Sequence, residues 1–193
     1  MIIDLIKFRD YCELRKWDFN EFTSEFTFQF RLCRYIEDSF DNQNIELESN
    51  INRYKLFKLS KKEIDIDILT NDSEKIAIEI KYIRDFGSHN IGMFEFCKDI
   101  KFLEELVEQS FSSGIAIIFT TIPNLYTSPN SELKPKNIEN INLYNAFRIN
   151  KNLRGELKIK TGKMDKSLIL KNSYPLQWID FTPNIKACIV NVK

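Results

Sequence analysis

The N-terminal part of the chain carries apolar positions at a spacing that predicts two helices. Residues 1–17 are compatible with a first helix, and a second, more regular one follows. Asp18 and Glu21 are spaced like a capping box, which places the start of the second helix near residue 18. The apolar positions that recur in this second helix are Phe22, Phe26, Phe30, Cys33 and Phe40.

The next stretch changes from a helical period to a period of two. Residues 42–52 are polar and predict a loop, and residues 54–59 form a less regular, strand-like run. Residues 63–68 alternate strictly between carboxylates and isoleucines, which predicts a strand with one acidic face. After a turn at 70–73, residues 76–82 are apolar until their end, as in a central strand that is covered on both faces.

A second regular helix and another strand follow. Residues 93–110 carry an apolar stripe at helical spacing, and residues 114–120 have the composition of a buried strand. The order strand, helix, strand predicts a crossover connection between two parallel strands. Residues 124–137 lie among prolines and predict a surface loop.

The last third of the chain is rich in strand patterns. Arg154-Gly155 is the clearest turn signal between them. We therefore expect an α/β fold with a β-rich C-terminal third on the same core. The strands predicted in this part are 143–149, 156–161, 167–171 and 187–192.

Length and composition narrow the class of protein. The chain has 193 residues, of which 43% are hydrophobic, which suits one domain with a sizeable core. No apolar run is long enough to span a bilayer, and the first residues lack the pattern of a signal peptide, so we expect a cytoplasmic protein without membrane contact. His89 is the only histidine, which argues against a zinc site and a Ser-His or Cys-His arrangement. Buried free thiols are expected at Cys12, Cys33, Cys97 and Cys188.

The charge is balanced overall but unevenly distributed. The formal net charge is zero, yet residues 134–171 hold ten basic residues against Glu139, Glu156 and Asp165. This local excess fits a side of the molecule that faces a polyanion. It fits a set of solvated hairpins equally well.

The segment from Glu63 to Lys81 carries the candidate chemistry. Glu79 and Lys81 are two residues apart on a strand, so their side chains leave the same face. Asp65 and Asp67 share a face of the preceding strand, and a hairpin would bring these carboxylates alongside Glu79. Carboxylates from two strands can hold Mg²⁺ or Mn²⁺, and a nearby lysine can orient a water molecule and stabilise developing charge.

This arrangement resembles the PD-(D/E)XK nuclease family. The similarity rests on Ile66-Asp67-Ile68-Leu69, the turn, and Ile76-Ala77-Ile78-Glu79-Ile80-Lys81, followed by a helix and an apolar strand. No proline precedes the acidic residue, which is a departure from the full motif. The resemblance implies one domain over residues 1–193, with a restriction-endonuclease-like mixed central sheet flanked by helices. It also implies a metal-dependent phosphodiesterase of endonuclease type that acts on nucleic acid, with DNA favoured, in restriction or phage defence.

The resemblance also implies the roles of individual residues. Asp67 is the favoured acidic ligand on the first strand, and Asp65 is the alternative, because the hairpin register decides which of them meets Glu79. Glu25, on the helix before the sheet, is the candidate for a further metal ligand. Lys98 and Lys101 are candidates for contacts with phosphates, and a solvated helix face is the alternative for both.

Other interpretations of the same residues stay open. The acidic strand fits a solvated amphipathic strand, and Glu79 with Lys81 fits an ion pair. A catalytically silent module of the same fold would bind nucleic acid or a protein partner without cleavage. A chain of this size has little room for a separate recognition domain, so a homodimer or a partner subunit would supply recognition.

Overall fold

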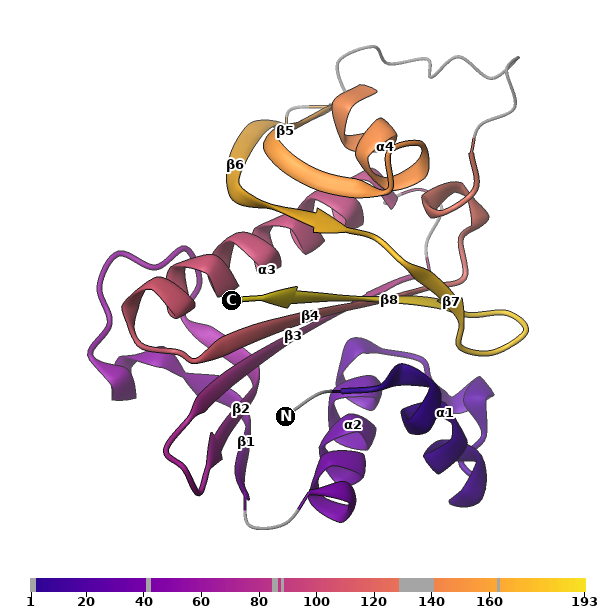
Figure 1. Cartoon of the computed structure of the whole chain (residues 1–193). Coiled ribbons are helices and arrows are strands. Elements are labelled where there is room, and N and C mark those ends of the chain that lie inside the picture. The colour runs from indigo at the N-terminus through magenta and orange to yellow at the C-terminus, as the bar shows by residue number, and fades with distance from the viewer. Residues whose placement is uncertain (1–2, 41–42, 85–86, 88, 129–140, 163) are drawn as a thin grey trace.

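The computed structural model describes residues 3–40, 43–84, 87, 89–128, 141–162 and 164–193. Within these ranges the main sheet is mixed and six-stranded, with the order β1-β2-β3-β4-β8-β7. Helices α1 and α2 cover one face of this sheet, and α3 covers the other (Figure 1). A two-stranded hairpin, β5–β6, lies with α4 on the outer side of α3. The chain is therefore an α/β protein built in layers, as expected.

The two N-terminal helices are α1 (Leu5–Leu14) and α2 (Glu25–Ser39). Asp18 caps only a short 3-10 turn (Phe19–Glu21), and α2 begins later because the Ser24 hydroxyl accepts a hydrogen bond from the Thr27 amide. The predicted start at residue 18 was therefore wrong, and so was part of the predicted apolar stripe. Phe26 and Phe30 are 58% and 49% exposed. The buried apolar residues of α2 are Phe28, Leu32, Cys33, Tyr35 and Ile36.

The acidic strand and its partner form a hairpin between an edge strand and the centre of the sheet. The elements are β1 (Gln43–Asn50), β2 (Glu63–Thr70) and β3 (Lys75–Ile83), and both pairs are antiparallel. Residues 43–50 of the loop predicted over 42–52 form a strand instead, because polar residues such as Glu46 and Glu48 face solvent at an edge while Ile45 and Leu47 pack against the core. The strand-like run at 54–59 forms no strand.

The predicted crossover is confirmed. Helix α3 (His89–Gln109) connects β3 to β4 (Ser113–Thr120), and these two strands pair in parallel from Ile76↔Ser113 to Ile83↔Thr120. Both strands are buried along most of their length, which explains their nearly continuous apolar sequence.

The C-terminal third adds α4 (Ile141–Arg148), β5 (Asn152–Thr161), β6 (Met164–Pro175), β7 (Trp178–Asp180) and β8 (Lys186–Val192). The strand predicted at 143–149 is a helix, because Leu143, Ala146 and Phe147 are buried at helical spacing. Gly155 lies at a register shift inside β5 with a φ of 62°, so it forms a bulge where a turn was predicted.

Two apolar cores lie on the two faces of the sheet, one against α3 and the hairpin and one against α1 and α2. Cys12, Cys33, Cys97 and Cys188 are buried free thiols within these cores, as predicted. None of the helices in the described ranges is long and apolar enough to cross a membrane.

Candidate functional site

The site lies where β2 separates from β3. The two strands pair from Leu69↔Lys75 to Ile66↔Ile78, while β2 continues to pair with β1 as far as Glu63. After Ile78, two amide groups on this edge of β3 donate to carboxylates instead of to β2. The Ile80 amide donates to Asp65 Oδ2 at 2.7 Å, and the Tyr82 amide donates to Glu25 Oε1 at 3.2 Å. The opening of the ladder thus draws two carboxylates to the edge of β3.

Glu79 is the buried centre of this arrangement. It is 1% exposed and its Oε2 contacts the ammonium group of Lys61, while its Oε1 has no hydrogen-bond partner within the described part of the chain. Burial raises the pKa of Glu79 well above its ordinary value, and the negative charges of Asp65 and Asp99 raise it further. The Lys61 ammonium acts in the opposite direction. Glu79 is therefore a carboxylate that favours the approach of a positive charge.

Asp99 and Lys61 complete this part of the site, and the sequence analysis missed both. Asp99 belongs to α3, is buried, and accepts a hydrogen bond from Lys61 Nζ at 3.0 Å. Burial raises the pKa of Asp99 to about 6, against the lowering effect of Lys61 and Lys81. One signal was present in the sequence, because Asp99 interrupts the apolar stripe of α3 between Phe96 and Leu103. Lys61 stands in an irregular segment that gave no such signal.

Lys81 and Glu25 meet at the open edge of β3, and the metal-ligand role of Glu25 stays a prediction. Lys81 Nζ lies 3.1 Å from Glu25 Oε1. Burial by itself would lower the pKa of Lys81, but the charges of Asp99 and Glu25 raise it above its ordinary value. Lys81 therefore stays charged beside the carboxylates.

Gln29 brings an uncharged oxygen to the same place. It lies one helical turn after Glu25, is buried, and its side chain lies close enough to Asp65 and Glu48 to act on both carboxylates. Its Oε1 has no hydrogen-bond partner among the described residues. Burial raises the pKa of Asp65, and the Ile80 amide and Gln29 offset part of that rise. The surroundings of Asp65 thus contain donors for its carboxylate and a spare acceptor from Gln29.

Asp67, the favoured ligand in the sequence analysis, lies in a different cluster. It is opposite Ala77 in the hairpin register and 2% exposed. Its Oδ2 accepts hydrogen bonds from Ser49 Oγ at 2.9 Å and from the Tyr54 hydroxyl, and Arg53 lies 3.9 Å away. The geometry therefore favours the alternative, Asp65, as the partner of Glu79.

Lys98 and Lys101 are engaged within α3. Lys98 Nζ lies 2.6 Å from Glu95 Oε2, and Lys101 Nζ lies 3.6 Å from Glu104 Oε2. No contact in the described ranges connects either lysine to Glu79 or Asp65. Their proposed contact with phosphates stays a prediction.

A divalent cation would need several oxygen donors that converge near Glu79. Within the described ranges no three histidine, cysteine, aspartate or glutamate side chains lie close enough to hold a metal ion. The carboxylates whose charges act on Glu79 are those of Asp65 and Asp99, and the Gln29 side chain lies near Asp65. Two of these groups present buried oxygens without a partner, at Glu79 and Gln29. Hard oxygen donors of this kind suit Mg²⁺ or Mn²⁺, which retain water molecules in their remaining positions. The residues therefore fit such an ion.

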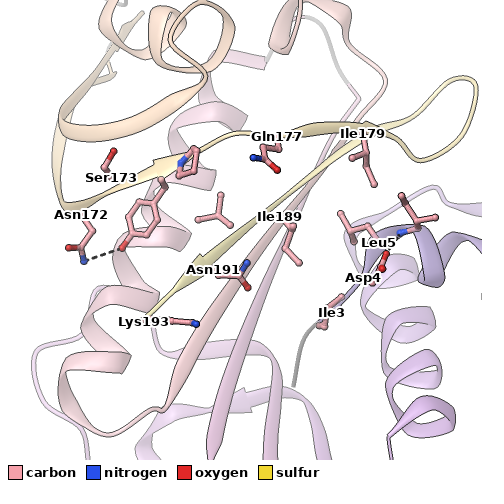
Figure 2. Close-up of a pocket in the computed structure, with 14 residues that line it drawn as sticks. Ile3, Asp4, Leu5, Asn172, Ser173, Gln177, Ile179, Ile189, Asn191 and Lys193 are labelled. Carbon is pink, nitrogen blue, oxygen red and sulfur yellow. Dashed lines mark hydrogen bonds between the residues drawn. The ribbon is translucent and has the colours of Figure 1, made fainter.

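The larger hollows of the molecule lie outside this buried cluster. One of about 680 Å³ lies between β8, the end of β6 and the segment that leads into α1 (Figure 2). It contains none of the residues gathered around Glu79. A second, of about 800 Å³, is lined by Tyr82, near the end of β3, and by Arg84, which follows that strand. The second hollow thus begins beside the site, and the first is unrelated to it.

The identification of the site rests on three features. The carboxylates converge where the β2–β3 ladder opens, Lys81 lies at the same edge, and buried oxygens of Glu79 and Gln29 are without partners in the described chain. Comparison with protein-family models, curated proteins and solved structures gave no match.

Proposed function

We propose that this chain is a divalent-metal-dependent phosphodiesterase that cleaves nucleic acid, with a PD-(D/E)XK-type site formed by Asp65, Glu79 and Lys81. The observation that carries the proposal is the convergence of these residues where β2 leaves β3, beside buried oxygens that have no partner in the described chain. An ordinary surface ion pair would leave no such oxygens buried. The sequence motif and the local geometry point to the same chemistry.

The side chains have separable roles in this proposal. Asp65, Glu79 and the Gln29 amide oxygen would hold the ion, which supplies a Lewis acid for the phosphoryl oxygen and acidifies a bound water. Lys81 stays charged and lies at the open edge of β3, where it can bind a phosphate oxygen and orient the attacking water. Glu25 holds Lys81 in place through its ion pair.

The hollow beside the site supports a polymeric substrate. It adjoins the ends of the parallel strands β3 and β4 through Tyr82 and Thr121. Its lining includes Trp17 and the basic Lys16 and Arg84, together with the acidic Glu13 and Asp18. Aromatic rings stack on bases, and basic side chains pair with phosphates. We propose DNA as the substrate class and a restriction-type or defence-associated role, both following from the PD-(D/E)XK resemblance.

The test is a cleavage assay on labelled double-stranded DNA, single-stranded DNA and RNA with Mg²⁺, Mn²⁺ or EDTA. Glu79→Gln should abolish cleavage, and Lys81→Met should reduce it about 100-fold or more, because each removes charge from the reacting centre. Glu63→Gln and Lys62→Met change the same residue types at exposed positions nearby and should leave the rate unchanged. Wild-type protein that cleaves none of the substrates with either metal would refute the proposal.

One observation favours a second candidate, a silent module of the same fold that binds DNA or a partner protein. The ammonium of Lys61 already neutralises Glu79 and Asp99 without a metal. Such a module would retard DNA in a gel, with an affinity that falls as salt rises, and would leave the DNA intact with Mn²⁺. Cleavage that depends on Glu79 would exclude it.

A further inference from the structure

Lys61 is the closest positive charge to the buried carboxylates. Its Nζ contacts Glu79 Oε2 and lies 3.0 Å from Asp99 Oδ1, so one ammonium bridges a strand and a helix. The charge of Asp65 also acts on it. A divalent ion that binds Glu79 would compete for the same negative charge.

The segment that carries Lys61 is attached to α3 while the side chain stays able to move. The Ser60 amide donates to Glu105 at 2.8 Å, and Phe57 exchanges two hydrogen bonds with the side chain of Gln109. The Lys61 side chain is 29% exposed, whereas that of Glu79 is fully buried. Part of the Lys61 side chain thus reaches solvent, and rotation about its four-carbon stem can withdraw the ammonium without movement of the backbone.

We infer that Lys61 is a resident counter-cation of Glu79, bound to Oε2, and is displaced toward solvent when a divalent ion binds at the free Oε1. This inference rests on the proposed function, because it assigns Lys61 a role toward the same ion. It gives the site two states, one neutralised by the protein itself and one by the metal.

The physical basis is competition between cations for one buried carboxylate. Without a cation, Glu79 and Asp99 would stand as buried negative charges close to Asp65, at a high desolvation cost. Lys61 offsets part of that cost in the metal-free protein. A divalent ion carries twice its charge, and once the ion is bound the ammonium is repelled. Metal binding therefore includes the work of displacing Lys61.

The experiment measures Mn²⁺ binding by calorimetry in the full chain without nucleic acid. Lys61→Met keeps the length of the side chain and removes the charge, and we expect it to bind Mn²⁺ about tenfold or more tightly than wild type. The melting temperature of its metal-free form should fall, and saturating Mn²⁺ should raise it by more than it raises that of wild type. Lys62→Met makes the same change at the exposed neighbour and should alter neither quantity. If Lys61→Met does not fold, Lys61→Gln, which keeps a hydrogen-bond donor, should show the same gain in affinity.

The outcomes separate this inference from the proposed function. Wild-type protein that binds Mn²⁺ and cleaves DNA, with an affinity that neutral substitutions of Lys61 leave unchanged or weaken, overturns the inference alone. Mn²⁺ binding by Lys61→Met but not by wild type supports the inference and refutes metal-dependent cleavage by the native chain. Absence of Mn²⁺ binding in both overturns the two together.

Discussion

The pair of aspartates on β2 allows stability and function to be tested separately by one kind of substitution. Asp67→Asn and Asp65→Asn make the same chemical change two residues apart on one face of the strand. Asp67 accepts hydrogen bonds from Ser49 and Tyr54, whereas Asp65 accepts one from the Ile80 amide and neighbours Glu79. We expect the two variants to lose different properties.

The cost of Asp67→Asn follows from its two hydrogen bonds. Both go to the same oxygen, Oδ2, so an amide oxygen at that position keeps both bonds without the charge, while the amide nitrogen replaces Oδ1, which is buried without a partner in the described chain. A hydrogen bond to a charged group contributes about 1 kcal/mol more than one between neutral groups. Two such bonds give a loss of about 2 kcal/mol, which corresponds to a melting temperature about 4 to 8 °C lower for a chain of this size. Mn²⁺ affinity and cleavage should stay close to wild type.

The expected result for Asp65→Asn is the reverse. Burial raises the pKa of Asp65, so the folded state disfavours its charged form relative to the unfolded chain. Removal of that charge near neutral pH should leave the free energy of unfolding unchanged or raise it slightly. Since Asp65 is the carboxylate next to Glu79, Mn²⁺ affinity and DNA cleavage should be lost.

Thermal melts, Mn²⁺ calorimetry and the cleavage assay on the two variants provide the comparison. The reasoning would be refuted if Asp67→Asn abolished metal binding at unchanged stability while Asp65→Asn kept activity. That result would return the ligand role to Asp67, as the motif in the sequence first indicated.

Three further predictions concern stability. Because the folded-state pKa of Asp99 is raised to about 6, the folded protein binds more protons than the unfolded chain between about pH 4 and 6. Its free energy of unfolding should therefore fall as pH rises through that window, and Asp99→Asn should flatten this slope in urea titrations; equal slopes would contradict it. Glu104 accepts hydrogen bonds from the amides of Lys171 and Asn172 and from the Tyr174 hydroxyl. Glu104→Gln should therefore lower the free energy of unfolding in urea by about 3 kcal/mol. An unchanged urea midpoint would show that Glu104 does not anchor the β5–β6 hairpin. A Cβ at Gly114 would lie 2.7 Å from Leu103 Cβ, so Gly114→Ala should lower stability by about 1–3 kcal/mol in the same assay, unless α3 shifts freely from β4.

Elements with a strong period and a buried face were predictable from the sequence. The strict alternation of β2, the apolar β3 and β4 and the stripe of α3 all follow from packing against a core, and all four are present. The wrong predictions concern elements whose secondary structure depends on their neighbours in the fold. The edge strand β1 keeps polar residues on its solvent side, and α4 is too short to establish a helical period against a strand pattern.

The site was predictable in part for the same reason. Lys81 does lie two residues after Glu79 on β3, and it contacts Glu25 of α2. Lys61 comes from an irregular segment, and Gln29 and Asp99 come from helices on opposite faces of the sheet. Their convergence depends on contacts between residues far apart in the chain, which no local pattern records.

The sequence by itself determined the central strands β2, β3 and β4 and placed Glu79 and Lys81 on one face of β3, because side chains alternate with a period of two. It could not distinguish Asp65 from Asp67, since both satisfy that period equally. Only the tertiary structure decided between them. β2 pairs with β1 along its length but with β3 only from Ile66 onward, so Asp65, just before that pairing begins, accepts a hydrogen bond from the Ile80 amide and lies beside Glu79. Where a ladder ends is set by the packing of whole elements, and that is why the choice lies outside the reach of the motif.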